Sequence, residues 1–191
     1  MQNGRDLRVI KTKANIKNTF IELLLKKDFT QITIQNILDQ ALINRSTFYK
    51  HYLDKYDLAE QLIDELMEKA ALFITDRFNP SKNNDPFSVI LSAYEYVYEN
   101  KKSILALWKI RVDKLHPYDD LQDLLKNYCM HYLTEHNVNE DNSLKDYYST
   151  LYASIALTTI KWFIEADNEP DIETIVGQFK YIWSKIGSEL F

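Results

Sequence analysis

The sequence of 191 residues has a formal net charge of −5 and contains one cysteine, three glycines and four prolines. This length allows one or two domains with a proper hydrophobic core. A single cysteine excludes an intramolecular disulfide and is typical of a reducing compartment. No stretch approaches the roughly 18 uninterrupted apolar residues of a membrane span, and the first residues lack the apolar core of a signal peptide. We therefore expect a cytoplasmic protein without a membrane segment.

The charge is unevenly distributed along the chain. Residues 1–55 contain ten lysines and arginines against five acidic residues, a balance of +5, whereas the remainder contains thirteen against twenty-three, a balance of −10. A basic N-terminal third on an acidic body is the electrostatic pattern of a small nucleic-acid-binding region attached to a regulatory domain. On charge alone, a merely solvated surface is an equal alternative.

The N-terminal region is predicted to be an arm followed by a helix. We expect residues 1–8 to form a partly basic arm, either disordered or in contact with DNA through Arg5 and Arg8, with Lys11 just beyond. A helix is predicted from Val9 to Lys27, because apolar residues recur there with helical spacing. Phe29, in the link that follows, would fill the core beneath this helix.

Two short helices joined by a turn are predicted between residues 33 and 52. Thr33 and Asn44 are residue types that cap helix N-termini. The first helix would place its apolar residues, Ile34, Ile37, Leu38 and Ala41, on one face. An apolar residue precedes each cap and another follows four residues after it, as in a hydrophobic staple, and Leu53 and Leu58 repeat this spacing. The pattern is typical of a helix-turn-helix DNA-binding motif.

The second of these helices, predicted from Arg45 to Tyr52, would bury Phe48 and Tyr52 and expose its polar side chains. Those side chains are donors, cations and an aromatic ring, the types that contact base edges and phosphates. Lys55 begins the next helix, where a cation opposes the helix dipole, and a bound phosphate would account for it. The expected DNA-binding residues are Thr33, Arg45, Ser46, Thr47, Tyr49, Lys50, His51 and Lys55.

The stretch INRSTFYKHYLDKYDL resembles the DNA-binding signature of the TetR family of transcriptional regulators. Its matching residues are Thr47, Phe48, Tyr49, His51, Tyr52 and Lys55, with Tyr52 where phenylalanine is commoner. The turn departs from the family's Ala-Gly-Val, because it reads Ala41-Leu42-Ile43. If Leu42 adopts the left-handed conformation that glycine supplies, the strain would be about 1 kcal/mol.

Few glycines and prolines interrupt the chain and no alternating strand pattern appears, which predicts an all-α fold. The resemblance implies that this fold has two domains. Residues 1–54 would form a three-helix DNA-binding head, and residues 55–191 a helical regulatory and dimerisation body. A helix from Lys55 to about Phe78, twice the usual length, would join the two. Polar loops at 79–85 and 137–142 separate further predicted helices at 87–99, 103–112, from 119 or 120 to 136, 143–166 and 171–190.

The last two predicted helices carry wide apolar stripes. These stripes are either internal core or one side of a dimer interface, and paired DNA-binding heads favour the dimer. The predicted interface residues are Leu151, Ile155, Trp162, Ile175, Phe179, Ile182 and Ile186.

Aromatic residues are concentrated in the predicted body. They would line a cavity for a small-molecule effector, or they would be ordinary core. The residues concerned are Tyr94, Tyr98, Trp108, Tyr128, Tyr132, Tyr152 and Trp162. No cofactor, metal or enzymatic activity is expected, because phosphate-loop, nucleophile and zinc-protease motifs are absent and the pair Cys129 and His131 is too sparse for zinc.

The C-terminal half, with YYSTLYASIALTTIKWFIEADNEPDIETI, more loosely resembles TetR regulators of dihydroxyacetone kinase. No ligand is inferred from this looser resemblance. The TetR signature implies a dimeric, ligand-responsive repressor that binds a pseudo-palindromic double-stranded operator. The alternatives are a TetR-fold activator or a DNA-binding protein controlled by a protein partner, a helical enzyme or metal-binding bundle, and a dimerisation adaptor.

Overall fold

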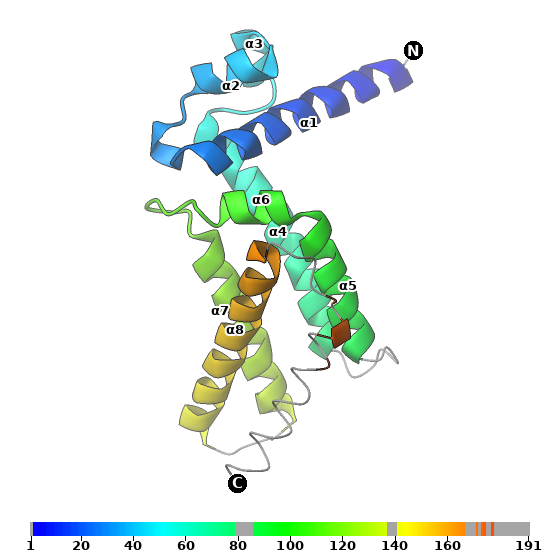
Figure 1. Cartoon of the computed structure of the whole chain (residues 1–191), viewed down its shortest axis with the longest axis vertical. Coiled ribbons are helices and arrows are strands. Elements are labelled where there is room, and N and C mark those ends of the chain that lie inside the picture. The colour runs from blue at the N-terminus through cyan, green and yellow to red at the C-terminus, as the bar shows by residue number, and fades with distance from the viewer. Residues whose placement is uncertain are drawn as a thin grey trace. The chain divides into compact units, whose positions relative to one another are not determined.

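The computed structural model describes residues 2–78, 86–136, 141–166, 171, 173, 174 and 177, with the side chains of 2–6, 86 and 87 left out. Within these residues the regular elements are helices, and the only pairing of strand type is an isolated bridge between Val112 and Leu115. The predicted all-α class is confirmed (Figure 1). No helix in the described part of the chain is long and apolar enough to span a membrane.

The elements follow one another in a simple order (Figure 1). They are α1 (Gln2–Lys26), the 3-10 helix η1 (Phe29–Gln31), α2 (Ile34–Ala41), α3 (Arg45–Tyr49), α4 (Lys55–Phe78), α5 (Pro86–Glu99), α6 (Lys101–Leu107), α7 (Pro117–Glu135) and α8 (Asn142–Glu165). The long helix predicted from Lys55 to Phe78 is confirmed. Of the helix predicted over 171–190, all but residues 171, 173, 174 and 177 lies outside the described residues.

Three predicted elements differ from the structure. The predicted N-terminal arm is helical, since α1 begins at Gln2 and Gly4 does not interrupt it. Helix α3 ends at Tyr49, because the backbone N–H groups of His51 and Tyr52 both donate to the Phe48 carbonyl and close a turn there. Helix α6 ends at Leu107, and the reciprocal backbone bonds between Val112 and Leu115 form a separate turn.

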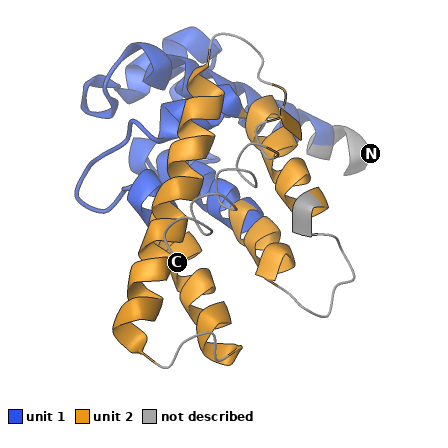
Figure 2. Cartoon of the chain, turned by 60° about the horizontal axis from the view of Figure 1, so that its bottom comes forward, with its two compact units in different colours: residues 1–69, 101–121 blue, residues 70–100, 122–191 orange. Residues whose placement is uncertain are grey.

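The chain forms two compact units (Figure 2). Unit 1 contains residues 1–69 and 101–121, and unit 2 contains residues 70–100 and 122–191. The boundaries of these units differ from those of the predicted domains, 1–54 and 55–191. Unit 1 also contains α6 and the first part of α4. The functional division after residue 54 stays a prediction.

The core of unit 1 lies beneath α1. This helix packs against α2 and α6, and its fully buried side chains include Ile16 and Phe20. Phe29 fills the core as predicted: it is 4% exposed and meets the rings of Phe20 and Tyr56 edge-on at centroid distances of 6.2 and 5.0 Å. Both rings therefore hold η1 against the core.

The predicted hydrophobic staple between Leu53 and Leu58 is wrong. Leu58 is fully buried, but Leu53 is 80% exposed. Polar contacts begin α4 instead: the Asp54 carboxylate accepts from the N–H groups of Tyr56 and Asp57 at 2.7 and 2.9 Å, and the Asp57 carboxylate accepts from the N–H of Leu53 at 2.7 Å. A carboxylate at the helix start also suits the helix dipole.

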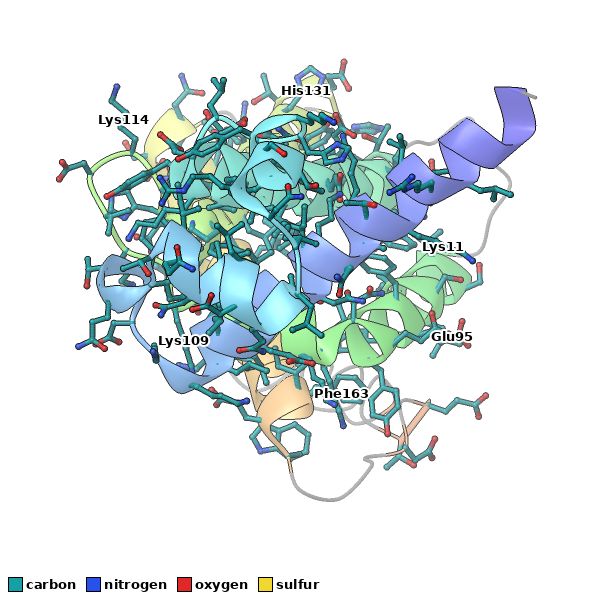
Figure 3. The ribbon with its side chains drawn as sticks, turned by 90° about the horizontal axis from the view of Figure 1, so that it is seen from above. Lys11, Glu95, Lys109, Lys114, His131 and Phe163 are labelled. Carbon is teal, nitrogen blue, oxygen red and sulfur yellow. The ribbon has the colours of Figure 1, made fainter. Side chains whose placement is uncertain are left out.

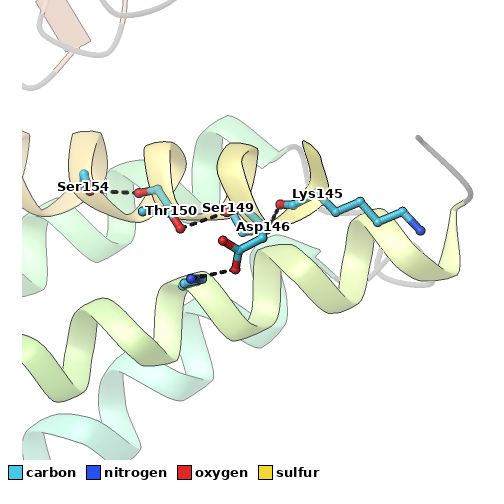
Figure 4. Close-up of polar contacts among 6 residues, drawn as sticks. Lys145, Asp146, Ser149, Thr150 and Ser154 are labelled. Carbon is cyan, nitrogen blue, oxygen red and sulfur yellow. Dashed lines mark hydrogen bonds and ion pairs between the residues drawn. The ribbon is translucent and has the colours of Figure 1, made fainter. Parts of the chain in front are cut away.

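In unit 2, α5 packs on α8. Helix α8 carries a row of hydroxyl groups that donate to carbonyls one turn earlier, from Ser149 to Lys145, Thr150 to Asp146 and Ser154 to Thr150 (Figure 4). The Asp146 carboxylate also pairs with Lys126 of α7 at 2.7 Å. These bonds satisfy the hydroxyls within the helix and join α7 to α8.

Candidate functional site

The first helix of the helix-turn-helix motif begins with a reciprocal cap. The Thr33 hydroxyl accepts from the N–H of Asn36 at 3.2 Å, and the Asn36 side chain accepts from the N–H of Thr33 at 3.1 Å. Two backbone donors that the helix leaves unpaired are thereby satisfied. The cap predicted at Thr33 is confirmed, and it fixes where α2 starts.

The turn between α2 and α3 depends on Leu42. This residue adopts φ 53° and ψ 44°, the left-handed conformation anticipated from the family's glycine. Its side chain is 90% exposed, so the apolar group gains little from packing. After the turn, the N–H of Ile43 donates to the Leu38 carbonyl at 3.1 Å and closes the end of α2.

The second helix is held by the side chain of Asn44. Its Oδ1 accepts from the N–H of Thr47 and from the Ser46 hydroxyl, both at 2.8 Å. The predicted cap is confirmed, and the hydroxyl hydrogen of Ser46 is already used inside the motif. Phe48 is fully buried, which fixes the rotation of α3 about its axis.

The outer face of α3 has the composition predicted for DNA contact. Arg45, Ser46, Tyr49 and Lys50 are exposed, while Thr47 and His51 are half-buried. Tyr49 is 46% exposed, stands at right angles to the Phe48 ring, and has the Arg45 guanidinium 6.0 Å from its ring centroid. A cation and an aromatic hydroxyl group therefore lie together on one exposed surface.

Lys55 is placed differently from the other predicted contacts. Its ammonium donates to the carbonyl oxygens of Phe29, Thr30 and Ile32 at 2.9, 3.3 and 2.8 Å. Burial lowers the pKa of Lys55, and the nearby Asp54 carboxylate opposes that shift. Sequence spacing contains no signal for this arrangement, because the three carbonyls lie more than twenty residues earlier.

A groove of about 380 Å³ lies between α1 and the helix-turn-helix turn. Its lining residues are Leu7, Arg8, Lys11, Thr12, Asn15 and Ile43. Arg8, which was predicted to approach DNA from an arm, and Lys11, predicted just beyond that arm, both lie on helix α1, where Lys11 is exposed (Figure 3). Asn15, which the sequence analysis missed, donates to the Ala41 carbonyl at 2.8 Å and joins α1 to the end of α2.

The predicted effector residues divide into three groups. Within unit 2, Tyr132 and Tyr152 contact Phe78 at centroid distances of 5.4 and 5.6 Å, and these three rings are called the aromatic cluster below. Tyr94 and Tyr98 contact Phe163 at 5.3 and 5.9 Å. Tyr128 accepts a hydrogen bond from the Thr75 hydroxyl. Trp108 belongs to unit 1, where it meets Tyr118 edge-on at 5.1 Å. Trp162 is 56% exposed and stays outside this aromatic cluster.

Arg77 was missed as a member of the aromatic cluster. Its guanidinium lies 5.7 Å from the Phe78 ring centroid, and among the described residues its buried Nε has no hydrogen-bond acceptor. Burial raises the pKa values of Tyr152 and of the Cys129 thiol, whereas the positive charge of Arg77 acts in the opposite direction on both. The sequence offered no clear signal for this role, because Arg77 directly follows Thr75 and Asp76.

The predicted dimer interface is described only in part. On α8, Leu151 and Ile155 are half-buried and Trp162 is exposed. Ile175, Phe179, Ile182 and Ile186 lie outside the described residues. In the part of the chain that the structure describes, no three His, Cys, Asp or Glu side chains are placed to hold a metal ion.

Known proteins similar to this chain are transcriptional regulators. The HTH-type transcriptional regulator YxbF of Bacillus subtilis (strain 168), itself uncharacterized, is 31% identical over 85 residues, which are 44% of this chain and only 21% of YxbF. A TetR transcriptional regulator from Streptococcus agalactiae 2603V has a TM-score of 0.61 at 22% identity, covering 95% of this chain and 98% of that one.

A second solved structure is the dihydroxyacetone kinase operon activator DhaS, with a TM-score of 0.58 at 16% identity, covering 93% of this chain and 97% of DhaS. At these identities the two structures show the fold, and DhaS agrees with the subgroup resemblance of the C-terminal half. Residues 84–185 match the family described as the TetR-type transcriptional regulator C-terminal region. Because that match covers more than half of a chain with a helix-turn-helix motif, the protein belongs to the TetR family of transcriptional regulators, and is not an enzyme.

Proposed function

We propose that this protein is a dimeric DNA-binding regulator that inserts α3 of each subunit into successive major grooves of a pseudo-palindromic operator. The half-sites would lie about one helical turn, roughly 34–36 Å, apart. The supporting observation is the outer face of α3, where Arg45, Tyr49 and Lys50 are exposed on a short helix that Asn44 caps and Phe48 anchors.

The residues of this face would have different roles. Arg45, Thr47 and Lys50 are proposed to contact bases, which carry the sequence information. Thr33, Tyr49 and His51 are proposed to contact phosphates, which set register. Ser46 lies on the same face, but its hydroxyl hydrogen is bonded to Asn44, so it would act as an acceptor. For Lys55, a phosphate contact competes with three carbonyl bonds.

Selection from a random-sequence duplex library, followed by footprinting, tests this function. The wild-type protein should enrich a palindrome and bind it with steep salt dependence, because phosphate contacts release counterions. Tyr49→Ala should abolish the footprint without unfolding the protein. Lys114→Ala, which removes an exposed cation in the turn after α6 (Figure 3), is the matched control and should bind like the wild type. Failure to enrich any sequence, or a wild-type footprint from Tyr49→Ala, would contradict the assignment.

We also infer that unit 2 receives a small-molecule effector at the aromatic cluster around Phe78, with Arg77 as its charged group. A guanidinium whose buried Nε has no acceptor among the described residues, close to aromatic rings, suits an anionic ligand with an aromatic part. Binding would change the spacing of the paired heads, with a coupling free energy of about 1–3 kcal/mol. If the protein is a repressor, effector binding would release it from its operator. DhaS, by contrast, is named as an activator. A reporter gene placed behind the selected palindrome would show whether this protein lowers or raises transcription.

A further inference from the structure

Lys55 has used its whole hydrogen-bonding capacity within the protein. An ammonium has three N–H donors, and Lys55 directs them to three carbonyl oxygens, with Ile32 at 2.8 Å, Phe29 at 2.9 Å and Thr30 at 3.3 Å. A phosphate oxygen could be bound only if one of these bonds were released. Releasing the bond to Ile32 would leave a partly buried carbonyl without this donor, and only the longest bond, to Thr30, lies at an exposed site.

Aromatic rings enclose the same ammonium. Its Nζ lies 4.7 Å from the ring centroid of Phe29 and 5.5 Å from that of Tyr56. These two rings pack edge-on against each other at 5.0 Å. Cation–π attraction is strongest where water is displaced, so the rings and the carbonyls favour the same position for the ammonium.

The bonded carbonyls mark a particular place in the chain. They belong to η1 and to Ile32, the corner between α1 and α2, and the next residue is Thr33, the cap of α2. Lys55 itself is the first residue of α4. Its three bonds therefore join the segment just before the helix-turn-helix motif to the segment just after it.

We propose that Lys55 is a positioning residue that closes the frame around the helix-turn-helix motif, and that it supports DNA binding without contacting phosphate. This proposal rests on the DNA-binding function proposed above. The ammonium holds the two ends of residues 33–54 together, so that α2 and α3 keep one orientation when they meet DNA. The cation is tolerated in the first turn of α4, against the helix dipole, because carbonyl oxygens surround it.

The test compares Lys55→Met with Lys50→Met in the full-length protein. Methionine has nearly the length of lysine but no charge and no donors. Lys50 is exposed at the end of α3, so Lys50→Met removes a predicted DNA contact and leaves the frame intact. Binding to the selected palindrome is measured over a range of salt concentrations, and amide hydrogen exchange of residues 29–36 is measured without DNA.

Lys55→Met should lower the affinity by a similar factor at every salt concentration, with an unchanged slope of log K against log salt. It should also speed exchange at residues 29–36 by about tenfold or more, the factor expected when a hydrogen bond to a charged group is lost. Lys50→Met, which removes a proposed base contact, should lower the affinity for the selected palindrome with normal exchange at residues 29–36. A lost phosphate contact would instead reduce the slope by about 0.9 units.

A loss of slope in Lys55→Met with normal exchange would overturn the proposal, because it would show a phosphate contact. If Lys55→Met does not fold, Lys55→Gln keeps an amide that reaches part of the way, and intermediate exchange is expected. Failure of the DNA-binding function is a separate result, in which the wild type would show no salt-dependent binding. The exchange measurement would still decide whether the hydrogen bonds of Lys55 stabilise residues 29–36.

Discussion

Leu42 adopts a backbone conformation that most residues avoid. A left-handed leucine places its Cβ against the following carbonyl, and its exposed side chain recovers almost none of that energy by packing. The turn nevertheless forms, because the caps and buried residues of α2 and α3 on either side of it are strong enough to impose it.

Leu42→Gly is therefore expected to raise the free energy of unfolding by about 1 kcal/mol. Urea denaturation followed by circular dichroism measures this change. Leu42→Ala is the control, because it removes the exposed side chain but retains the Cβ, and its stability should match the wild type. Equal stabilisation by both variants would assign the effect to the lost apolar surface.

Tyr52 is the other unusual single residue. It is 1% exposed, and its hydroxyl has no hydrogen-bond partner within the described residues. Burial, assisted by the carboxylates of Glu65 and Asp57, raises the pKa of Tyr52 to about 12. Phenylalanine, the family's commoner residue here, would leave no such group unsatisfied, and the Lys13 ammonium 5.9 Å from the ring centroid would keep its aromatic contact.

Tyr52→Phe should stabilise the protein by about 1 kcal/mol at neutral pH, since a buried unsatisfied polar group costs about that much. It should also change the alkaline response. Because the pKa is raised in the folded state, stability falls as the pH rises from 10 towards 12, where the unfolded chain loses its proton more readily. The decrease in the urea midpoint between pH 9 and pH 11 should be smaller in Tyr52→Phe than in the wild type. An equal decrease in the two proteins would contradict the assignment.

Among the helices, α3 depends most on its cap. It has only five residues, too few to be stable from its own backbone bonds. Asn44 supplies two of the bonds that hold its first turn, and Phe48 supplies the buried anchor. A recognition helix this short can keep a fixed orientation only while both are present.

Asn44→Ala should cost about 1 kcal/mol of stability, because the Thr47 N–H loses its acceptor. Hydrogen exchange at the Thr47 amide should become faster, and urea denaturation measures the overall loss. Asn44→Asp preserves an acceptor oxygen and should lose much less stability. Similar losses in the two variants would mean that the side-chain amide, and not the acceptor, is what matters at this position.

For the whole molecule, the proposed dimer rests on α8. An indole that is 56% exposed is a costly surface for an isolated subunit and a suitable one for an interface. Ile155 and Leu151 lie about two and three turns away towards the start of the same helix. In the proposed complex, DNA phosphates would repel residues 56–191, with their balance of −10, and attract the basic first third of the chain.

Trp162→Glu is expected to produce monomers in sedimentation equilibrium at micromolar concentrations, because a carboxylate would be buried at the interface. Such monomers should lose affinity for the palindrome but not for an isolated half-site. Lys161→Glu, which also adds an acidic residue at the neighbouring exposed position, should remain dimeric. A dimer that persists in Trp162→Glu would place the interface elsewhere.

The local features of this protein were predictable from its amino-acid sequence. The caps at Thr33 and Asn44 and the extent of α4 were predicted from local patterns, because the bonds that decide them close within a few residues. The left-handed conformation of Leu42 was anticipated from the glycine that the TetR signature has at this position. The family signature is equally local, since its matching positions lie between Thr47 and Lys55. The burial of Phe29 was also expected from the sequence and is confirmed.

Features that depend on distant partners could be read only from the folded chain. The carbonyls that receive the Lys55 ammonium lie 23 to 26 residues earlier, and Asn15 bonds a carbonyl 26 residues later. Trp108 and Trp162 looked alike as aromatic residues on helices, but one packs in unit 1 and the other is exposed. Side-chain periodicity specifies which face of a helix is apolar, whereas the packing of the folded chain decides what that face, or a cation beside it, will meet.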